Sequence, residues 1–96
     1  MPIVRIVKLT FQKDKGKEFI KIFESSKNKI RAFEGCTHLE LWNDINTPDV
    51  FMTYSHWDSE ADLLKYRDSE LFQFTWKQVK PIFAAEAEAW SMNKLY

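Results

Sequence analysis

Alternating apolar and polar residues predict four β-strands along the chain. The first covers residues 3–11, where apolar side chains fill one phase and recur in the other. Residues 37–44 alternate in the same way, and residues 50–57 are rich in β-branched and aromatic side chains, which favour strands. Turn-forming residues at 46–49 join these two stretches into a predicted hairpin. A last alternating stretch, within residues 85–96, predicts a closing strand.

Stretches with helical spacing of apolar residues separate these strands. Over residues 19–33 the apolar side chains recur three and four positions apart, which predicts a helix of about four to five turns. Gly35 is a suitable left-handed stop for this helix. Ser59, followed by Asp three residues later, resembles a capping box and predicts a second helix, and Ser69 gives another start signal. Pro81 lacks a backbone N–H and is expected to end or kink that helical region.

The predicted order of elements is β-α-β-β-α-β. It is the order of the ferredoxin-like α+β fold, in which helices cover one face of a four-stranded antiparallel sheet. No linker or repeat interrupts the chain, so we expect a single domain over residues 1–96. The first and third strands carry large apolar side chains in both phases, so both sheet faces require burial. Because the helices cover only one face, we expect a homodimer packed sheet against sheet.

The charge and the glycine content exclude several classes of function. Fourteen Lys and Arg residues balance fourteen Asp and Glu residues, so we expect neither nucleic acid nor a membrane as a partner. The two glycines, Gly16 and Gly35, are 19 residues apart, which excludes the glycine-rich phosphate loops of dinucleotide-binding and P-loop proteins. One cysteine and the lack of a long apolar run are typical of a soluble, cytoplasmic protein.

Few residues have the spacing of a catalytic or metal site. His38 and His56 lie on the two strands of the predicted hairpin, but no His-x-His or His-Glu-x-x-His motif accompanies them, so we expect no metal site. Each histidine is either a solvated strand residue or a pocket acid or base. Arg5 interrupts the more apolar phase of the first strand. It either binds an anionic oxygen inside a cavity or stays in solvent or in an ion pair.

The aromatic content is the strongest positive signal. Fifteen of the 96 residues are Phe, Trp or Tyr, and the tryptophans all fall on predicted elements. Packing in the core and across a dimer explains many of these rings. The surplus of Trp and Tyr, which have polar tips, also fits a cavity for a flat, largely apolar ligand. Both explanations can hold together.

Several segments resemble those of one known family. They are Phe33-Glu34-Gly35-Cys36, Tyr54 to Leu63 with its Trp-Asp-Ser-Glu-Ala run, Tyr66, Ser69-Glu70, Phe72 and Pro81-Ile82-Phe83. Over nearly the whole chain they resemble the antibiotic biosynthesis monooxygenase domain of the dimeric α+β barrel superfamily. The resemblance implies a homodimer with a ligand cavity between sheet and helices in each protomer. Some members oxygenate polycyclic phenols or quinols with O₂ and neither metal nor flavin, whereas others degrade haem, act on signalling molecules or have no known activity.

The haem-degrading branch of that family has its own residue pattern. It requires an Asn on the first strand and a Trp and a His on the second helix. An ungapped match puts Val7, Tyr66 and Trp76 at these positions, and all three depart from the pattern. We therefore do not expect haem degradation of that type, and we expect no cofactor.

The resemblance implies a cofactor-independent monooxygenase that acts on a small phenol or quinol. Such chemistry requires an acceptor for the phenol proton and a donor to the peroxide intermediate in a dry cavity. Our candidates are His56 for proton transfer, Tyr66 and Trp57 for orientation and Arg5 for the oxyanion. The alternative is a non-catalytic homodimer of the same fold that binds a small apolar or aromatic ligand. A third possibility, a metal- or haem-dependent enzyme, would show colour or metal on purification.

Overall fold

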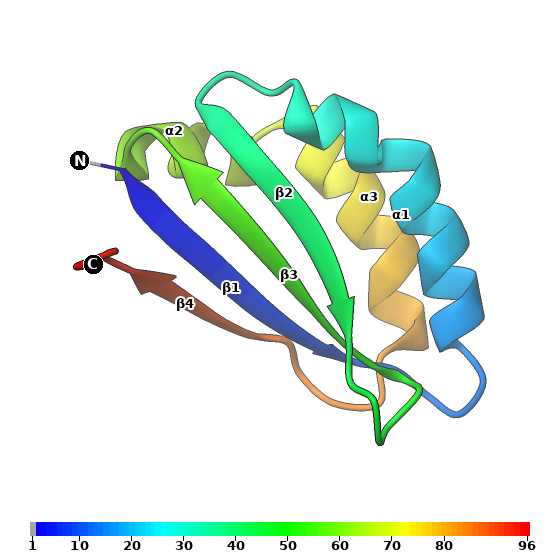
Figure 1. Cartoon of the computed structure of the whole chain (residues 1–96). Helices are drawn as coiled ribbons and strands as arrows, with labels where there is room; N and C mark the ends of the chain where they lie inside the picture. Colours follow the sequence, from blue (N-terminus) through cyan, green and yellow to red (C-terminus); the bar gives the residue numbers. More distant parts are fainter. Residues whose placement is uncertain (1) are drawn as a thin grey trace.

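A computed structural model describes residues 2–96 of the chain and contains the predicted elements (Figure 1). They are β1 (Ile3–Thr10), α1 (Gly16–Arg31), β2 (Cys36–Asn43), β3 (Val50–Trp57), α2 (Glu60–Arg67), α3 (Glu70–Val79), the 3-10 turn η1 (Lys80–Ile82) and β4 (Glu88–Met92). The strands pair antiparallel in the order β2-β3-β1-β4. All three α-helices lie on one side of the sheet, and no helix covers the other side (Figure 1). The predicted ferredoxin-like α+β fold is confirmed.

Side-chain caps divide the second helical region where the sequence predicts. The Ser59 hydroxyl accepts a hydrogen bond from the Asp62 backbone N–H at 3.1 Å and starts α2, and the Ser69 hydroxyl accepts one from the Phe72 N–H at 3.1 Å and starts α3. These bonds satisfy backbone donors that have no partner inside the helix. Pro81 lies in η1, directly after α3 ends.

The ends of two elements differ from the sequence prediction. α1 ends at Arg31 rather than at Gly35, because the α-helical bonds stop after Ala32: the Phe33 N–H donates to the Ile30 carbonyl, three residues back, at 3.1 Å. Gly35 does take a left-handed φ of 88°, but it serves the turn that leads into β2. β4 is shorter than the predicted closing strand, because only residues 88–92 pair with β1.

The hydrophobic core lies between the sheet and the helices in two clusters. The first surrounds the end of β1 and the start of β3 and consists of Leu9, Phe11, Phe19, Phe51, Val79 and Ile82. The second, at the opposite end of these strands, consists of Cys36, Trp57 and Leu63. Between them, the strand register sets Arg5 beside Ser55 and Ser91, and Val7 beside Thr53 and Ala89. The middle of this face therefore carries small or polar side chains that do not fill the space below the helices.

The side of the sheet without helices, called the bare face here, carries many apolar and aromatic residues. By the strand register its apolar and aromatic members are Val4, Ile6, Trp42, Met52, Tyr54, Trp90 and Met92, and its polar members include Lys8, His38, Glu40, His56 and Glu88. Trp42, Trp90 and Met92 are exposed, at 42%, 40% and 46% of their surface. An apolar area of this kind is typical of an interaction surface. No helix within residues 2–96 has both the length and the apolar character needed to cross a membrane.

Candidate active site

A partly open cavity of about 370 Å³ lies between the helices and the sheet, within the size range of small-molecule sites. Its lining consists of Arg5, Val7 and Leu9 from β1, Leu39 from β2, Thr53, Ser55 and Trp57 from β3, Ala87 and Ala89 near and on β4, Phe19, Phe23 and Ile30 from α1, Leu63, Tyr66 and Arg67 from α2, and Phe72, Thr75, Trp76 and Val79 from α3. Most of these side chains are apolar or aromatic. The cavity thus combines an apolar body with a few polar groups.

Tyr66 projects from α2 into this cavity as part of an aromatic wall. Its ring stacks on Trp57 with centroids 5.0 Å apart and meets Phe72 edge-on at 5.3 Å. Burial raises the pKa of Tyr66 far above its ordinary value. The phenol therefore keeps its proton at neutral pH, so Tyr66 can donate a hydrogen bond to a ligand but cannot act as a base.

Trp57 forms the floor of the cavity at the end of β3. It is the most buried large side chain, with 1% of its surface exposed. Its indole N–H donates to the Ser55 hydroxyl at 3.0 Å, which fixes the ring and satisfies both polar groups. Because this N–H is already used, Trp57 shapes the cavity rather than offering a free donor.

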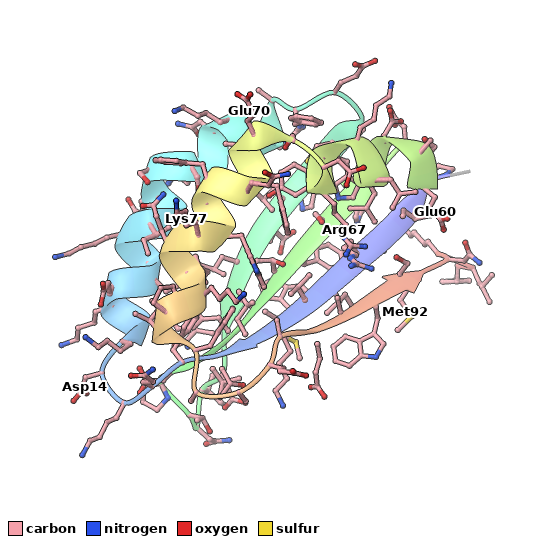
Figure 2. All side chains as sticks on the ribbon, turned by 180° about the vertical axis from the view of Figure 1, so that it is seen from behind. Asp14, Glu60, Arg67, Glu70, Lys77 and Met92 are labelled. Carbon is pink, nitrogen blue, oxygen red and sulfur yellow. The ribbon has the colours of Figure 1, made fainter. Side chains whose placement is uncertain are left out.

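Two arginines bring positive charge to the cavity. Arg5 Nη1 donates to the Ser91 hydroxyl at 2.9 Å, and Arg67 reaches from α2 toward β1 (Figure 2). Burial lowers the pKa of Arg5, and the nearby charge of Arg67 lowers it further. The guanidinium of Arg5 nevertheless stays charged at neutral pH. Arg5 thus lies inside the cavity rather than in an ion pair.

A buried hydroxyl adds a third kind of polar group. Thr75 lines the cavity from α3, and among the side chains of residues 2–96 its Oγ1 is the one buried N or O atom without a hydrogen-bond partner. Such atoms are rare because each costs about 1–3 kcal/mol of desolvation. A ligand oxygen that reaches Thr75 would remove this cost.

His56 differs from the other predicted site residues because it lies on the bare face. The period of a strand is two residues, so a side chain between Ser55 and Trp57 points away from the cavity that those two residues line. The His56 ring instead bonds to the Tyr54 hydroxyl at 2.7 Å and lies 5.1 Å from the His38 ring, which pairs with Glu40. The proton-transfer role predicted for His56 therefore has no place in this cavity.

The neighbours of His56 do not create a metal centre. Within residues 2–96, no three His, Cys, Asp or Glu side chains are grouped so that they could hold a metal ion. Burial and the nearby His38 and Lys94 charges lower the pKa of His56, while Glu40 opposes them. Hydrogen bonds from His38 and Trp42 lower the pKa of Glu40. The group is a polar network beside the apolar side chains of the bare face.

Sequence reasoning missed Arg67 and Thr75 as cavity residues. Arg67 follows the buried Leu63 by four positions, and Thr75 lies three positions after Phe72. Each of them therefore shares a helix face with a side chain that packs inward. This spacing could have identified both. Arg5, Trp57 and Tyr66, by contrast, are brought together by the fold as the sequence suggested.

The fold and the cavity define a class: a small ferredoxin-like α+β domain with a largely apolar cavity between its sheet and its helices. The sequence profile described as antibiotic biosynthesis monooxygenase matches residues 2–77, most of the chain. This protein belongs to that family, as the resemblance indicated.

Several solved structures share the fold. A candidate antibiotic biosynthesis monooxygenase from Nitrosomonas europaea aligns with a TM-score of 0.93 and 16% identity over 99% of this chain and 91% of its own. A conserved protein from Methanosarcina mazei aligns with a TM-score of 0.91 and 19% identity over 98% of this chain and 93% of its own. Another structure, of an antibiotic biosynthesis monooxygenase, aligns with a TM-score of 0.91 and 15% identity over 98% of this chain and 99% of its own. At these identities the likeness concerns the fold alone. No curated protein matches the chain.

Proposed function

We propose that this protein is a monooxygenase that oxidises a phenol or quinol in the cavity without metal or flavin. Membership of the family supports the reaction class. The composition of the cavity supports the proposed type of substrate. Aromatic and aliphatic walls surround hydrogen-bond donors and positive charge, a setting that suits a flat ring bearing an ionised oxygen.

The reaction needs no external reductant when the substrate supplies the electrons. The ring CH₂ group of an anthrone-type substrate loses a proton, which gives a phenolate whose charge is shared with that carbon, and this carbon forms a C–O bond with O₂. The peroxide anion takes up a proton and then loses its C–H proton as the O–O bond breaks, which gives a ketone and hydroxide, and hydroxide takes up a second proton. The sum is R₂CH₂ + O₂ → R₂C=O + H₂O. The cavity must therefore stabilise an anion and then a peroxide.

The cavity residues have properties that suit these two tasks. The guanidinium of Arg5 would lower the pKa of a bound phenol and stabilise its oxyanion. The protonated Tyr66 hydroxyl would donate to the peroxide oxygen. Trp57 would hold the substrate ring in position. His56 has no part in these steps, because the ionisable cavity residues are Arg5, Tyr66 and Arg67, and the substrate proton passes to water.

Oxygen uptake by metal-free protein tests the proposal. Anthrones and hydroquinones should be consumed with O₂, and Tyr66→Phe should lower kcat by about tenfold or more, the loss of one hydrogen bond to a developing anion. Tyr96→Phe removes the same hydroxyl from an exposed position and should leave the rate unchanged. Absence of uptake across the panel, or an equal rate for Tyr66→Phe and the wild type, would refute the proposal.

One observation favours a second candidate, a binding protein without catalysis. Of the residues that line the cavity, none is an acid or base that titrates near neutral pH. Such a site can bind an apolar ligand with an anionic group and leave it unchanged. Stoichiometric binding of a quinol without oxygen uptake would support this candidate over the monooxygenase.

We also infer that the chain forms a homodimer through the bare face. Trp42, Trp90 and Met92 extend a row of half-buried apolar side chains there, and no helix covers them (Figure 1). A second copy of the same face would bury this area in a two-fold arrangement. Light scattering should give twice the chain mass. We expect the dimer to act in the cytoplasm as a single domain over residues 1–96.

A further inference from the structure

The charge of the cavity differs from that of the whole protein. The chain as a whole is neutral, yet the cavity is lined by Arg5 and Arg67 and by no Asp or Glu, which gives a local charge of +2. Within residues 2–96, neither arginine forms an ion pair with a carboxylate. Arg5 is half-buried and lies close enough to the exposed Arg67 for that charge to lower the Arg5 pKa, yet the pair lacks a counter-charge among the residues that the structure describes. A ligand is the natural source of that charge.

The geometry points to an aromatic carboxylic acid as the ligand class, with its carboxylate held by Arg5 and Arg67. A guanidinium offers five donors in a planar fork that matches the two oxygens of a carboxylate. Arg5 uses only one nitrogen on Ser91 and keeps the rest of its fork for a ligand. Arg67 lies at an exposed position, so it can meet the acid as it enters.

The remaining walls determine what carries the carboxylate. Tyr66 stacks on Trp57, and Phe72 stacks on Trp76 with centroids 5.6 Å apart, so two aromatic pairs line one cavity. Flat rings pack against such surfaces without the entropy cost of a flexible chain. The unpartnered Thr75 hydroxyl adds one hydrogen-bonding position away from the sheet. The best ligand is therefore a fused or substituted ring with one acid group and one further oxygen.

This inference rests on the proposed use of the cavity as the substrate site, but not on turnover. If both hold, the substrate is a hydroxylated aromatic acid whose carboxylate is bound by the arginines. Redox-inert probes separate the two claims. 2-Naphthoate and 2-naphthamide have the same ring and nearly the same shape, and they differ in charge.

Isothermal titration of the full chain with both probes tests the inference. 2-Naphthoate should bind at least about tenfold more tightly than 2-naphthamide, the usual value of a charge-assisted pair of hydrogen bonds. Arg67→Gln and Arg5→Gln should each remove most of this preference and leave 2-naphthamide unaffected. Lys65→Gln is the matched control, because it removes a positive charge from the same helix at a residue outside the cavity lining.

Each outcome of the titration is decisive. Equal affinity for the two probes, binding of neither, or an equal loss in Lys65→Gln and Arg67→Gln would overturn the inference. A carboxylate preference in a protein that takes up no oxygen would support the inference and refute the monooxygenase. Oxygen uptake with neutral anthrones, together with equal affinity for the two probes, would support the monooxygenase and refute the inference.

Discussion

The substitution Gly35→Ala tests how the turn before β2 positions the site. Gly35 has a left-handed φ of 88°, and a Cβ added there would lie 2.4 Å from Cβ of Asp62. Asp62 is the third residue of α2 and bonds twice to the N-cap Ser59: its backbone N–H donates to the Ser59 hydroxyl at 3.1 Å, and its side chain accepts from that hydroxyl at 2.9 Å. α2 in turn carries Tyr66. Strain at one glycine is thus passed through the cap to the cavity.

The expected loss of stability has two parts. A left-handed conformation costs an alanine about 1–2 kcal/mol. The contact with Cβ of Asp62 cannot be relieved by a side-chain rotation, because that atom is fixed by the backbone of α2. Moving α2 weakens its N-cap, which is worth about 0.5–2 kcal/mol. Together these effects predict a loss of about 1.5–4 kcal/mol, a large share of the 5–15 kcal/mol typical of a domain.

Urea unfolding of the variants measures the loss of stability from the left-handed conformation and from the displacement of α2. Gly35→Asn keeps the clash but tolerates the left-handed conformation better, so it should unfold at a concentration between those of the wild type and Gly35→Ala. Binding of an aromatic ligand should weaken in both variants as α2 moves. If Gly35→Ala is within about 0.5 kcal/mol of the wild type, the range of a neutral surface substitution, the reasoning is refuted.

Four further predictions concern single residues. Trp57→Phe should lower the free energy of unfolding by about 1–3 kcal/mol, because it removes buried ring volume and the bond to Ser55. The lowered pKa of His56 means that folding releases its proton, so stability should be full above about pH 6.5 and fall as the pH drops below it. Trp90→Glu should convert the dimer to a monomer in light scattering, because the charge lies on the bare face. Burial raises the pKa of Cys36, so iodoacetamide at pH 8 should label the folded chain far more slowly than the unfolded chain.

Each of these measurements has a control. Trp42→Phe tests whether the cost of the Trp57 change is specific to the buried ring. His56→Gln should remove the acid sensitivity; an unchanged pH profile would contradict the assignment to His56. A dimer that survives Trp90→Glu would exclude that part of the bare face from the interface. Equal labelling of Cys36 with and without urea would show that the thiol is accessible in the folded chain.

The fold was predictable because its signals are local. The caps at Ser59 and Ser69 and the turn residues at 46–49 act through neighbours a few residues away, and the structure confirms them. The sequence predicts too late an end for α1, because a glycine such as Gly35 is suited both to stopping a helix and to forming a turn. Helix periodicity cannot choose between them.

The site was harder to predict because it depends on which face of a strand a side chain occupies. Arg5 was found because it interrupts an apolar phase, which marks the face that the helices cover. His56 has the right chemistry for a base, but its strand is apolar in both phases, so the pattern does not distinguish the cavity from the bare face. Arg67 is exposed and looks like an ordinary helix residue until the fold brings it above β1.

We propose that the ligand site lies in the cavity beneath the helices. The four tryptophans test it in one experiment, because Trp57 and Trp76 line the cavity while Trp42 and Trp90 lie on the bare face. Indole N–H signals in a ¹⁵N NMR spectrum, assigned by single Trp→Phe variants, can be followed as 2-naphthoate is added. We expect the signals of Trp57 and Trp76 to shift and saturate together while those of Trp42 and Trp90 stay in place. Shifts confined to Trp42 and Trp90 would contradict it.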